Sequence, residues 1–366
     1  MSQDVYAWGF LGDRELSIPQ RIDVGSVPVT ALLPGGFTFG TALSRKGHVH
    51  VFGGLGVVQE GSGLAGALSE STSEPVSCGA AGYDHVVAAC GDSGTAGDSG
   101  RFRCHLYGWG ANANGQAVPE LAETEVLTPK SISFGHPVKQ IACGARHTLV
   151  LTADAGVFAF GDNSNGQLGC ATESHRNGIV HVPLNAGHTV ISIAAGALHS
   201  LLALAGDSGV YAFGWNLYGQ CGTGDNLDVR TAALIPGLSG IAVSGIAGGL
   251  SHSACVTQSG DAYVWGRIDG ASIQHGGQDN TGSPALTPQL CESPDLDGCV
   301  SAIRCGARHI AALRHDGSVV CWGWNGHGQT SALTVPAVDI QCGWWHTLAL
   351  ITRSGEPPAT ASAAPC

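Results

Sequence analysis

Histidine and cysteine are the residues of this sequence that could carry chemistry, because both bind metals and both serve in catalysis. The chain has 16 His and 13 Cys among 366 residues. It contains no Cys-x-x-Cys pair, no His-x-x-x-His pair and no phosphate-binding glycine loop. The segment 91–100, GDSGTAGDSG, resembles a nucleophile or phosphate loop, but a lengthened hairpin explains it better. We therefore predict a non-catalytic protein with no metal and no cofactor.

Six of the histidines share one context, Gly-x-x-His followed by Thr, Ser or an aliphatic residue. These repeat histidines are His85, His147, His199, His252, His309 and His346. A seventh copy runs from Gly36 to Phe39, with Phe39 at the histidine position. We expect each repeat histidine to begin a buried strand and to bond neighbouring backbone. Their predicted role is structural.

A second element, an aliphatic run ending in aromatic-Gly, alternates with the first. Its seven copies lie 44 to 57 residues apart and end at Gly9, Gly53, Gly110, Gly161, Gly214, Gly266 and Gly323. Short apolar segments such as 147–152 and 157–161 are typical of buried strands, and Asp154-Ala155-Gly156 between them indicates a hairpin turn. An Asn/Gly turn and a Pro-bearing outer strand follow. Four short strands per repeat of about fifty residues indicate a β-propeller blade.

The chain begins and ends in the middle of a repeat. Residues 4–24 supply an aromatic-Gly strand and an outer strand, and residues 338–353 supply an inner pair. Together they complete one blade. We predict an all-β, seven-bladed propeller of four-stranded antiparallel blades, closed by pairing of the N- and C-terminal strands. One domain would span 1–353, with a flexible tail at 354–366.

Composition excludes several classes of function. Charged residues make up 12% of the chain, its net charge is −12, and only three lysines occur. An acidic chain this poor in lysine lacks the basic stripe that binds nucleic acid or anionic lipid. No apolar run is long enough to span a bilayer, and no signal peptide is visible. The cysteines fit reduced thiols of a cytoplasmic or nuclear protein, and Cys143, Cys305 and Cys342 share a position that calls for a small packing residue.

The two alternating elements resemble those of the regulator of chromosome condensation repeat family, which are seven-bladed propellers. The resemblance covers residues 4–353, and its most specific pieces are 144–148 with 157–169 and 196–200 with 210–222. Kelch propellers are the alternative fold because of glycine pairs such as Gly35-Gly36. The family includes an exchange factor for a nuclear small GTPase, a plant ultraviolet-B photoreceptor and adaptors that bind proteins. Fold alone does not choose among these functions.

Guanine-nucleotide exchange on a small GTPase is the alternative function. The resemblance implies acidic and histidine side chains just before the repeat histidine. Here Asp84 fits that pattern, whereas Arg146 and Arg308 reverse the charge, and the stretch after Gly110 is an ordinary turn without the family's wedge. For light sensing, residues 343–347 are the single near-match to the plant receptor's tryptophan motif.

A protein-binding face is the prediction that remains. The turns before the repeat histidines and the Asn/Gly turns follow strands of the same direction, so both should emerge on one face. The predicted partner-binding residues are Asp84, Arg146, Trp215, Arg308, Trp324, Trp344 and Trp345. Such residue types dominate interfaces, although Trp215 and Trp324 could instead pack on neighbouring loops. The opposite face would carry the long loops 90–104 and 266–299.

We accordingly predict a protein-interaction scaffold. Its length and single-domain organisation resemble a small animal adaptor of this family that works with a Jumonji-type histone demethylase near chromatin. That resemblance implies a histone demethylase as partner, whereas the alternative function implies a small GTPase.

Overall fold

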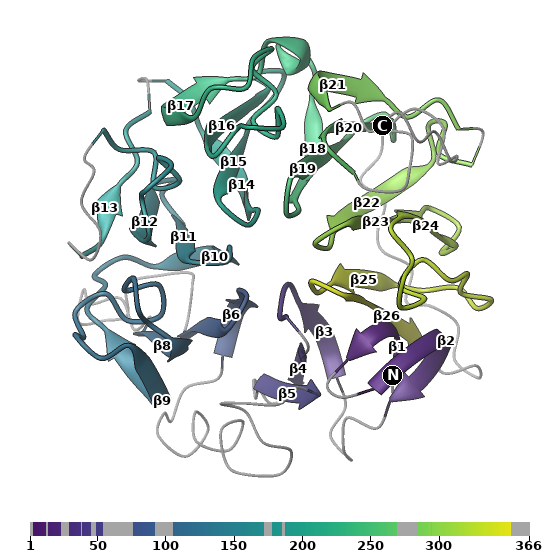
Figure 1. The fold of residues 1–366 in the computed structure, drawn as a ribbon, viewed down its shortest axis with the longest axis horizontal. Coiled ribbons are helices and arrows are strands. Elements are labelled where there is room, and N and C mark those ends of the chain that lie inside the picture. The colour runs from purple at the N-terminus through teal and green to yellow at the C-terminus, as the bar shows by residue number, and fades with distance from the viewer. Residues whose placement is uncertain are drawn as a thin grey trace.

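A computed structural model describes residues 3–11, 14–22, 29–37, 39–44, 49–53, 76–91, 105–171, 178–184, 187–268, 284–293 and 295–352. The strands in these residues form seven antiparallel sheets that follow one another around a ring (Figure 1). We number the first six sheets as blades 1 to 6 in chain order and call the seventh, which contains both terminal strands, the closing blade. The tail 354–366, residues 92–104 of the loop 90–104, and residues 269–283 and 294 of the loop 266–299 lie outside the described residues.

The strands of each blade run consecutively from the ring axis outward. Blade 1 holds β3 (Val29–Leu33), β4 (Phe39–Ser44) and β5 (Val49–Gly53). Blade 2 holds β6 (Val76–Ala81), β7 (His85–Cys90), β8 (His105–Ala111) and β9 (Glu125–Ile132). Blade 3 holds β10 (Val138–Cys143), β11 (His147–Thr152), β12 (Val157–Gly161) and β13 (Val180–His181). Blade 4 holds β14 (Val190–Ala195), β15 (His199–Leu204), β16 (Val210–Gly214) and β17 (Val229–Leu234).

The remaining blades repeat the pattern. Blade 5 holds β18 (Val243–Gly248), β19 (His252–Thr257), β20 (Ala262–Gly266) and β21 (Ala285–Leu290). Blade 6 holds β22 (Val300–Cys305), β23 (His309–Arg314) and β24 (Val319–Gly323). The closing blade holds β25 (Asp339–Cys342), β26 (His346–Thr352), β1 (Gln3–Leu11) and β2 (Arg14–Ile22), in that order from the axis. A short 3-10 turn, η1 (Pro236–Leu238), follows β17.

The predicted closure by the terminal strands is confirmed. β1 pairs antiparallel with β26, with Gln3 opposite Thr352 and Gly9 opposite His346. The all-β propeller of antiparallel blades is confirmed with it. The expectation of four strands in every blade is wrong for blade 6, where residues 324–337 form turns and irregular chain instead of an outer strand. Blade 1 shows three strands in its described part.

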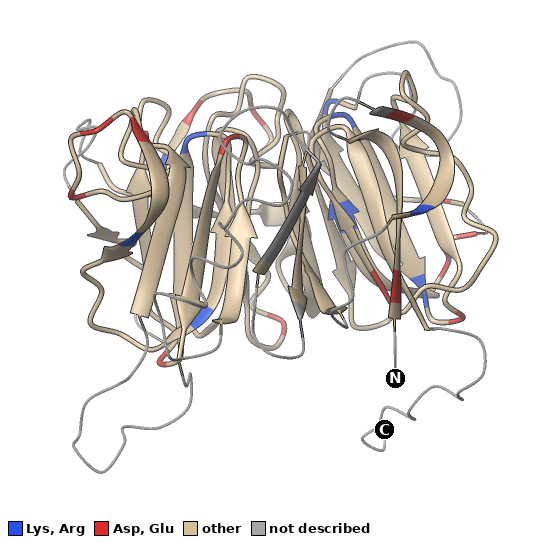
Figure 2. Ribbon diagram, turned by 90° about the horizontal axis from the view of Figure 1, so that it is seen from below, with Lys and Arg blue, Asp and Glu red and all other residues tan. Residues whose placement is uncertain are grey.

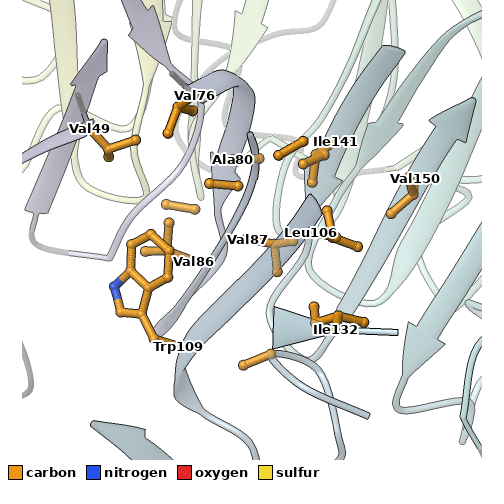
Figure 3. Close-up of a cluster of buried hydrophobic side chains, with 14 of the residues drawn as sticks. Val49, Val76, Ala80, Val86, Val87, Leu106, Trp109, Ile132, Ile141 and Val150 are labelled. Atoms are coloured by element: carbon orange, nitrogen blue, oxygen red, sulfur yellow. The ribbon is translucent and has the colours of Figure 1, made fainter. Parts of the chain in front are cut away.

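Apolar side chains fill the space between neighbouring blades. Trp8, Trp109 and Trp265, which stand before the glycine of the aromatic-Gly element, are at most 1% exposed, as expected for core residues. In Figure 3, Trp109 of β8 lies in a cluster that also includes Val49 of blade 1 and Val150 of blade 3. Figure 2 shows the ring from the side, with strands running between its two faces and few charged residues along them. No helix in the described part is long and apolar enough to cross a membrane.

Candidate partner-binding face

The Gly-x-x-His turn has its glycine because the imidazole folds back over it. The N–H of Gly144 donates to the carbonyl of His147 at 2.9 Å, which closes the turn. A Cβ at Gly144 would lie 2.3 Å from Cε1 of His147 and 2.5 Å from the carbonyl oxygen of Gly196 in the next blade. The corresponding glycines of the other five Gly-x-x-His turns would place a Cβ 2.1 to 2.3 Å from the same imidazole atom. A side chain at this position therefore cannot be accommodated.

Each of four repeat histidines reaches a hydroxyl of the next blade. Nε2 of His147 lies 3.0 Å from Oγ of Ser200, and that hydroxyl donates to the carbonyl of Gln167 at 2.8 Å. Because the carbonyl takes the single hydroxyl proton, the oxygen accepts from the histidine, whose proton must be on Nε2. The same relay joins His85 to Thr148, His199 to Ser253 and His309 to Thr347.

We expected these four imidazoles to bond neighbouring backbone. At Nε2 this expectation is wrong, because the partner is a side-chain hydroxyl. The Thr or Ser that follows the repeat histidine in the sequence serves the histidine of the preceding blade. This explains why the small hydroxyl residue belongs to the motif.

Burial keeps five of the repeat histidines neutral. It lowers the pKa of His85, His199 and His309 to about 3, and that of His147 and His346 to about 4. Near neutral pH such groups neither carry charge nor exchange protons readily. Within the described ranges, no three His, Cys, Asp or Glu side chains converge as metal ligands would.

A closed ring of backbone hydrogen bonds joins the turns at this end of the propeller. The donor and acceptor residues are Tyr83 to Gly144, Ala145 to Ala197, Ala197 to Gly249, Leu250 to Ala307, Ala307 to Trp344, Trp344 to Gly36, and Phe37 to Tyr83. Because these bonds use only the main chain, the two side chains between glycine and histidine do not hold the ring together. We call the end of the propeller that carries these turns the repeat face.

The two sets of predicted turns meet on the repeat face. The carbonyl of Arg308 accepts the N–H of Trp324, which directly follows the aromatic-Gly element. The same bond joins Leu198 to Trp215 in blade 4. The repeat face thus carries all seven predicted partner-binding residues, Asp84, Arg146, Trp215, Arg308, Trp324, Trp344 and Trp345.

Three of these residues form one cluster. The guanidinium carbon of Arg308 lies 6.0 Å from the ring centroid of Trp324 and 5.9 Å from that of Trp345. The two indoles meet edge to face, with centroids 5.2 Å apart. Arg308 and both indoles are half-buried. A cation held at the faces of two indoles, and reachable from solvent, is the chemistry of an interface anchor.

Further aromatic rings extend this cluster across the closing blade to blades 1 and 2. His327 lies between Trp324 and Phe10, with ring centroids 5.1 Å apart in each contact, edge to face with Trp324 and tilted against Phe10. From Trp345 the contacts continue to Phe37, then to Tyr83 and then to Trp344. The distances between successive ring centroids are 6.4, 4.2 and 4.8 Å. We call Phe10, Phe37, Tyr83, Trp324, His327, Trp344 and Trp345 the aromatic arc.

Sequence reasoning missed Phe10, Phe37 and Tyr83 as members of this surface. Tyr83 directly follows the glycine of a Gly-x-x-His turn, as Trp344 does, and Phe37 holds the same position in the copy from Gly36 to Phe39. Phe10 directly follows an aromatic-Gly element, as Trp324 does. Aligning the repeats at these two positions therefore indicates the aromatic residues of this surface.

The other predicted residues lie outside the aromatic arc. Arg146 is exposed and makes no ion pair within the described part of the chain. Asp84 is exposed next to Tyr83, and desolvation raises the pKa of its carboxyl group. Trp215 packs edge to face on Tyr218, at 5.5 Å, and the guanidinium of Arg267 lies 5.1 Å from the Tyr218 ring. This second cation–aromatic cluster belongs to blades 4 and 5.

The inner-strand cysteines line the ring axis, where small residues were expected. Cys143, Cys305 and Cys342 end the innermost strands β10, β22 and β25. Burial raises the pKa of Cys143 and Cys342 to about 12 and raises that of Cys305. These thiols are protonated near neutral pH and therefore weakly nucleophilic.

Comparison with known proteins agrees with this geometry. A family model described as RCC1-like domain matches residues 4–335. The Ultraviolet-B receptor UVR8 of Arabidopsis thaliana is 30% identical over 290 residues, which are 75% of this chain and 64% of the receptor. The human probable E3 ubiquitin-protein ligase HERC6 is 34% identical over 292 residues, which are 75% of this chain and 26% of the ligase. The chain thus spans less than two thirds of the length of these relatives.

Two solved structures share the fold at low sequence identity. Human WBSCR16 superposes with a TM-score of 0.78 at 21% identity, over 95% of this chain and 100% of that one. Prp20p of Saccharomyces cerevisiae, characterised with its binding to Gsp1p and histones, gives a TM-score of 0.75 at 20% identity, over 96% and 92% of the two chains.

Proposed function

The chain belongs to the RCC1-like domain family, and we propose that it acts as a non-catalytic scaffold that binds a protein partner on its repeat face. The observation that supports this most directly is Arg308, which lies close to the rings of both Trp324 and Trp345. Arg and Trp are the residue types that contribute most to interface affinity, particularly where they are partly withdrawn from water.

An acidic segment of the partner is the ligand that this face fits. Arg146 and Arg308 occupy equivalent turns of blades 3 and 6 on a protein whose net charge is −12. The competing idea, that each arginine merely pairs with acidic neighbours such as Asp84, finds no support at Arg146, which makes no ion pair within the described ranges. An exposed guanidinium such as that of Arg146 can donate two parallel hydrogen bonds to a carboxylate.

A Jumonji-type histone demethylase near chromatin is the specific partner that we propose. The proposed locations, nucleus and cytoplasm, follow from the reduced cysteines and from that partner. Exchange on a small GTPase is the alternative, and the likeness to Prp20p at 20% identity supports it only through the shared fold. Release of bound guanine nucleotide from a panel of small GTPases separates the two functions, because a scaffold leaves the release rate unchanged.

Charge reversal on the repeat face tests the scaffold proposal. Partners captured from an extract of the native cell would be identified by mass spectrometry, and their affinity measured with purified components. Arg146→Glu with Arg308→Glu should weaken binding by about 2 kcal/mol or more, roughly thirtyfold, if both arginines are hot spots.

The control variant should carry the same charge change elsewhere. Arg21→Glu with Lys130→Glu alters two exposed residues of the outer strands β2 and β9 and should leave affinity unchanged. If the repeat-face variant folds and retains full affinity, the partner binds elsewhere and the proposal is wrong.

A further inference from the structure

A cavity of about 450 Å³ runs along the axis of the ring, between the innermost strands. Its walls come from every blade. They include Ile141, Ile193 and Ile246, and many alanines and glycines, while Trp344 lies at the repeat-face end. This volume lies in the range of small-molecule sites, which is roughly 300 to 1,000 Å³. The wall is mainly apolar.

Blade 6 places a charged residue where four blades carry alanine, blade 1 carries Pro34 and the closing blade carries Gln341. Two residues before the glycine of the Gly-x-x-His turn, blades 2 to 5 each carry an alanine: Ala80, Ala142, Ala194 and Ala247. Blade 6 carries Arg304 at this position, and Arg304 lines the cavity. Successive residues of a strand rise about 3.3 Å, so this guanidinium is anchored within the channel, below its rim.

Two hydrogen bonds from the guanidinium group hold the Arg304 side chain in place. Nε donates to Oε1 of Gln341 at 3.0 Å, and Nη1 donates to the carbonyl of Ile303 at 2.9 Å. Asp339 Oδ1 lies 3.9 Å from Nη2, which is beyond hydrogen-bond distance. The remaining N–H groups of Nη1 and Nη2 have no acceptor among the described residues. The side chain is 30% exposed, so these donors can be reached from the cavity.

The charged side chains that line the cavity are both cationic, while the Asp339 carboxylate, which is not a lining residue, lies 3.9 Å from Nη2 of Arg304. Arg304 and Lys139 are the ionised side chains among its described lining residues, and no carboxylate lines it. A cationic channel in a protein of net charge −12 concentrates anions locally. Arginine presents a planar fork that matches a carboxylate, while the apolar walls suit a hydrocarbon chain.

We propose that the axial channel is a binding site for a small organic monocarboxylate, with Arg304 as its anchor. The carboxylate accepts from the open N–H groups of Nη1 and Nη2, and the hydrocarbon part lies against the mainly apolar wall of the channel. This site is distinct from the repeat face, and its existence does not depend on the proposed scaffold function.

Isothermal titration calorimetry of the full chain with sodium hexanoate tests this proposal. Hexanamide, which lacks the charge, and inorganic phosphate, which lacks the hydrocarbon, are the comparison ligands. We expect saturable hexanoate binding and at least tenfold weaker binding of either comparison ligand.

Three variants assign the binding to Arg304. Arg304→Gln should weaken hexanoate binding at least tenfold, whereas Asp339→Asn should strengthen it about threefold, because a competing carboxylate is removed. Arg308→Gln, on the repeat face, should change it less than twofold. A thermal melt of each variant confirms folding.

The proposal is overturned if wild-type protein shows no saturable hexanoate binding, or if folded Arg304→Gln binds hexanoate as tightly as wild type. Should Arg304→Gln fail to fold, Asp339→Asn decides alone, and unchanged or weaker binding contradicts the proposal. Equal affinity for hexanoate and phosphate would refute the apolar part of the site.

Discussion

Replacing Ser200 by alanine tests whether the histidine–hydroxyl relay stabilises the contact between neighbouring blades. The substitution removes the acceptor of His147 Nε2 and the donor to the Gln167 carbonyl at once. Ser200, His147 and Gln167 are fully buried, so water cannot readily take the place of the hydroxyl. Each of these two unsatisfied buried groups costs about 1–3 kcal/mol, and we therefore expect the free energy of unfolding to fall by about 2–6 kcal/mol.

Urea unfolding followed by tryptophan fluorescence measures this loss, provided that the slope with urea stays constant. Ser131→Ala, at an exposed position on β9, is the matched control and should lie within about 0.5 kcal/mol of wild type. A double-mutant cycle with His147→Ala should show a coupling of about 1–2 kcal/mol, because the two single changes remove the same bond. Additive effects, or a Ser200→Ala variant as stable as the control, would refute the relay.

Three further predictions follow from the structure. Gly144→Ala should destabilise the fold by more than about 3 kcal/mol or prevent folding, because its Cβ would meet His147 and Gly196, whereas Gly135→Ala, with nothing within 4 Å, should be neutral in urea melts. Deleting residues 1–24 removes β1 and β2 and exposes β26, so the protein should aggregate or melt early, and an unchanged melting temperature would contradict closure by β1. The free energy of unfolding should fall as pH drops from about 6.5 toward 4, because the unfolded chain protonates histidines whose folded pKa lies at about 3 or 4. The loss should reach about 2 kcal/mol per buried histidine by pH 5. Circular dichroism showing an unchanged fold at pH 4.5 would exclude this.

The repeating part of the fold was predictable because steric constraints act on the same residue in every blade. Gly144 must be glycine to admit the imidazole of His147, and Gly161, with φ of +113°, must be glycine to approach the carbonyl of Arg146. Constraints of this kind recur once in each blade, so blade order and closure could be derived from the sequence. The partner of the imidazole could not, because the hydroxyl that it meets lies 53 residues away, in the next blade.

The candidate site was predicted only in part, because its residues are defined by contacts between blades. Arg308, Trp324 and Trp345 come from two neighbouring blades, and their convergence depends on side-chain rotamers that no periodicity reveals. Arg304 was overlooked for a related reason: it occupies a strand position where four other blades carry alanine, and it matters only because the inner strands enclose a cavity.

Within each turn, some residues stabilise the fold and others are free to vary, which explains why this fold can bind different partners. Glycine, histidine and the main chain close the ring, and the residue just before the histidine contributes its carbonyl to this bonding, as Arg146 does to Asp162 and Arg308 does to Trp324. At Ser251 the hydroxyl also donates to the carbonyl of Arg267. Any side chain at that position is compatible with the same backbone bond. Asp84, Arg146, Leu198, Ser251, Arg308 and Trp345 occupy it in six turns of this chain. Recognition can therefore change by substitution at these positions while stability is set by the residues on either side of them, which is why charge reversal at Arg146 and Arg308 should separate binding from folding.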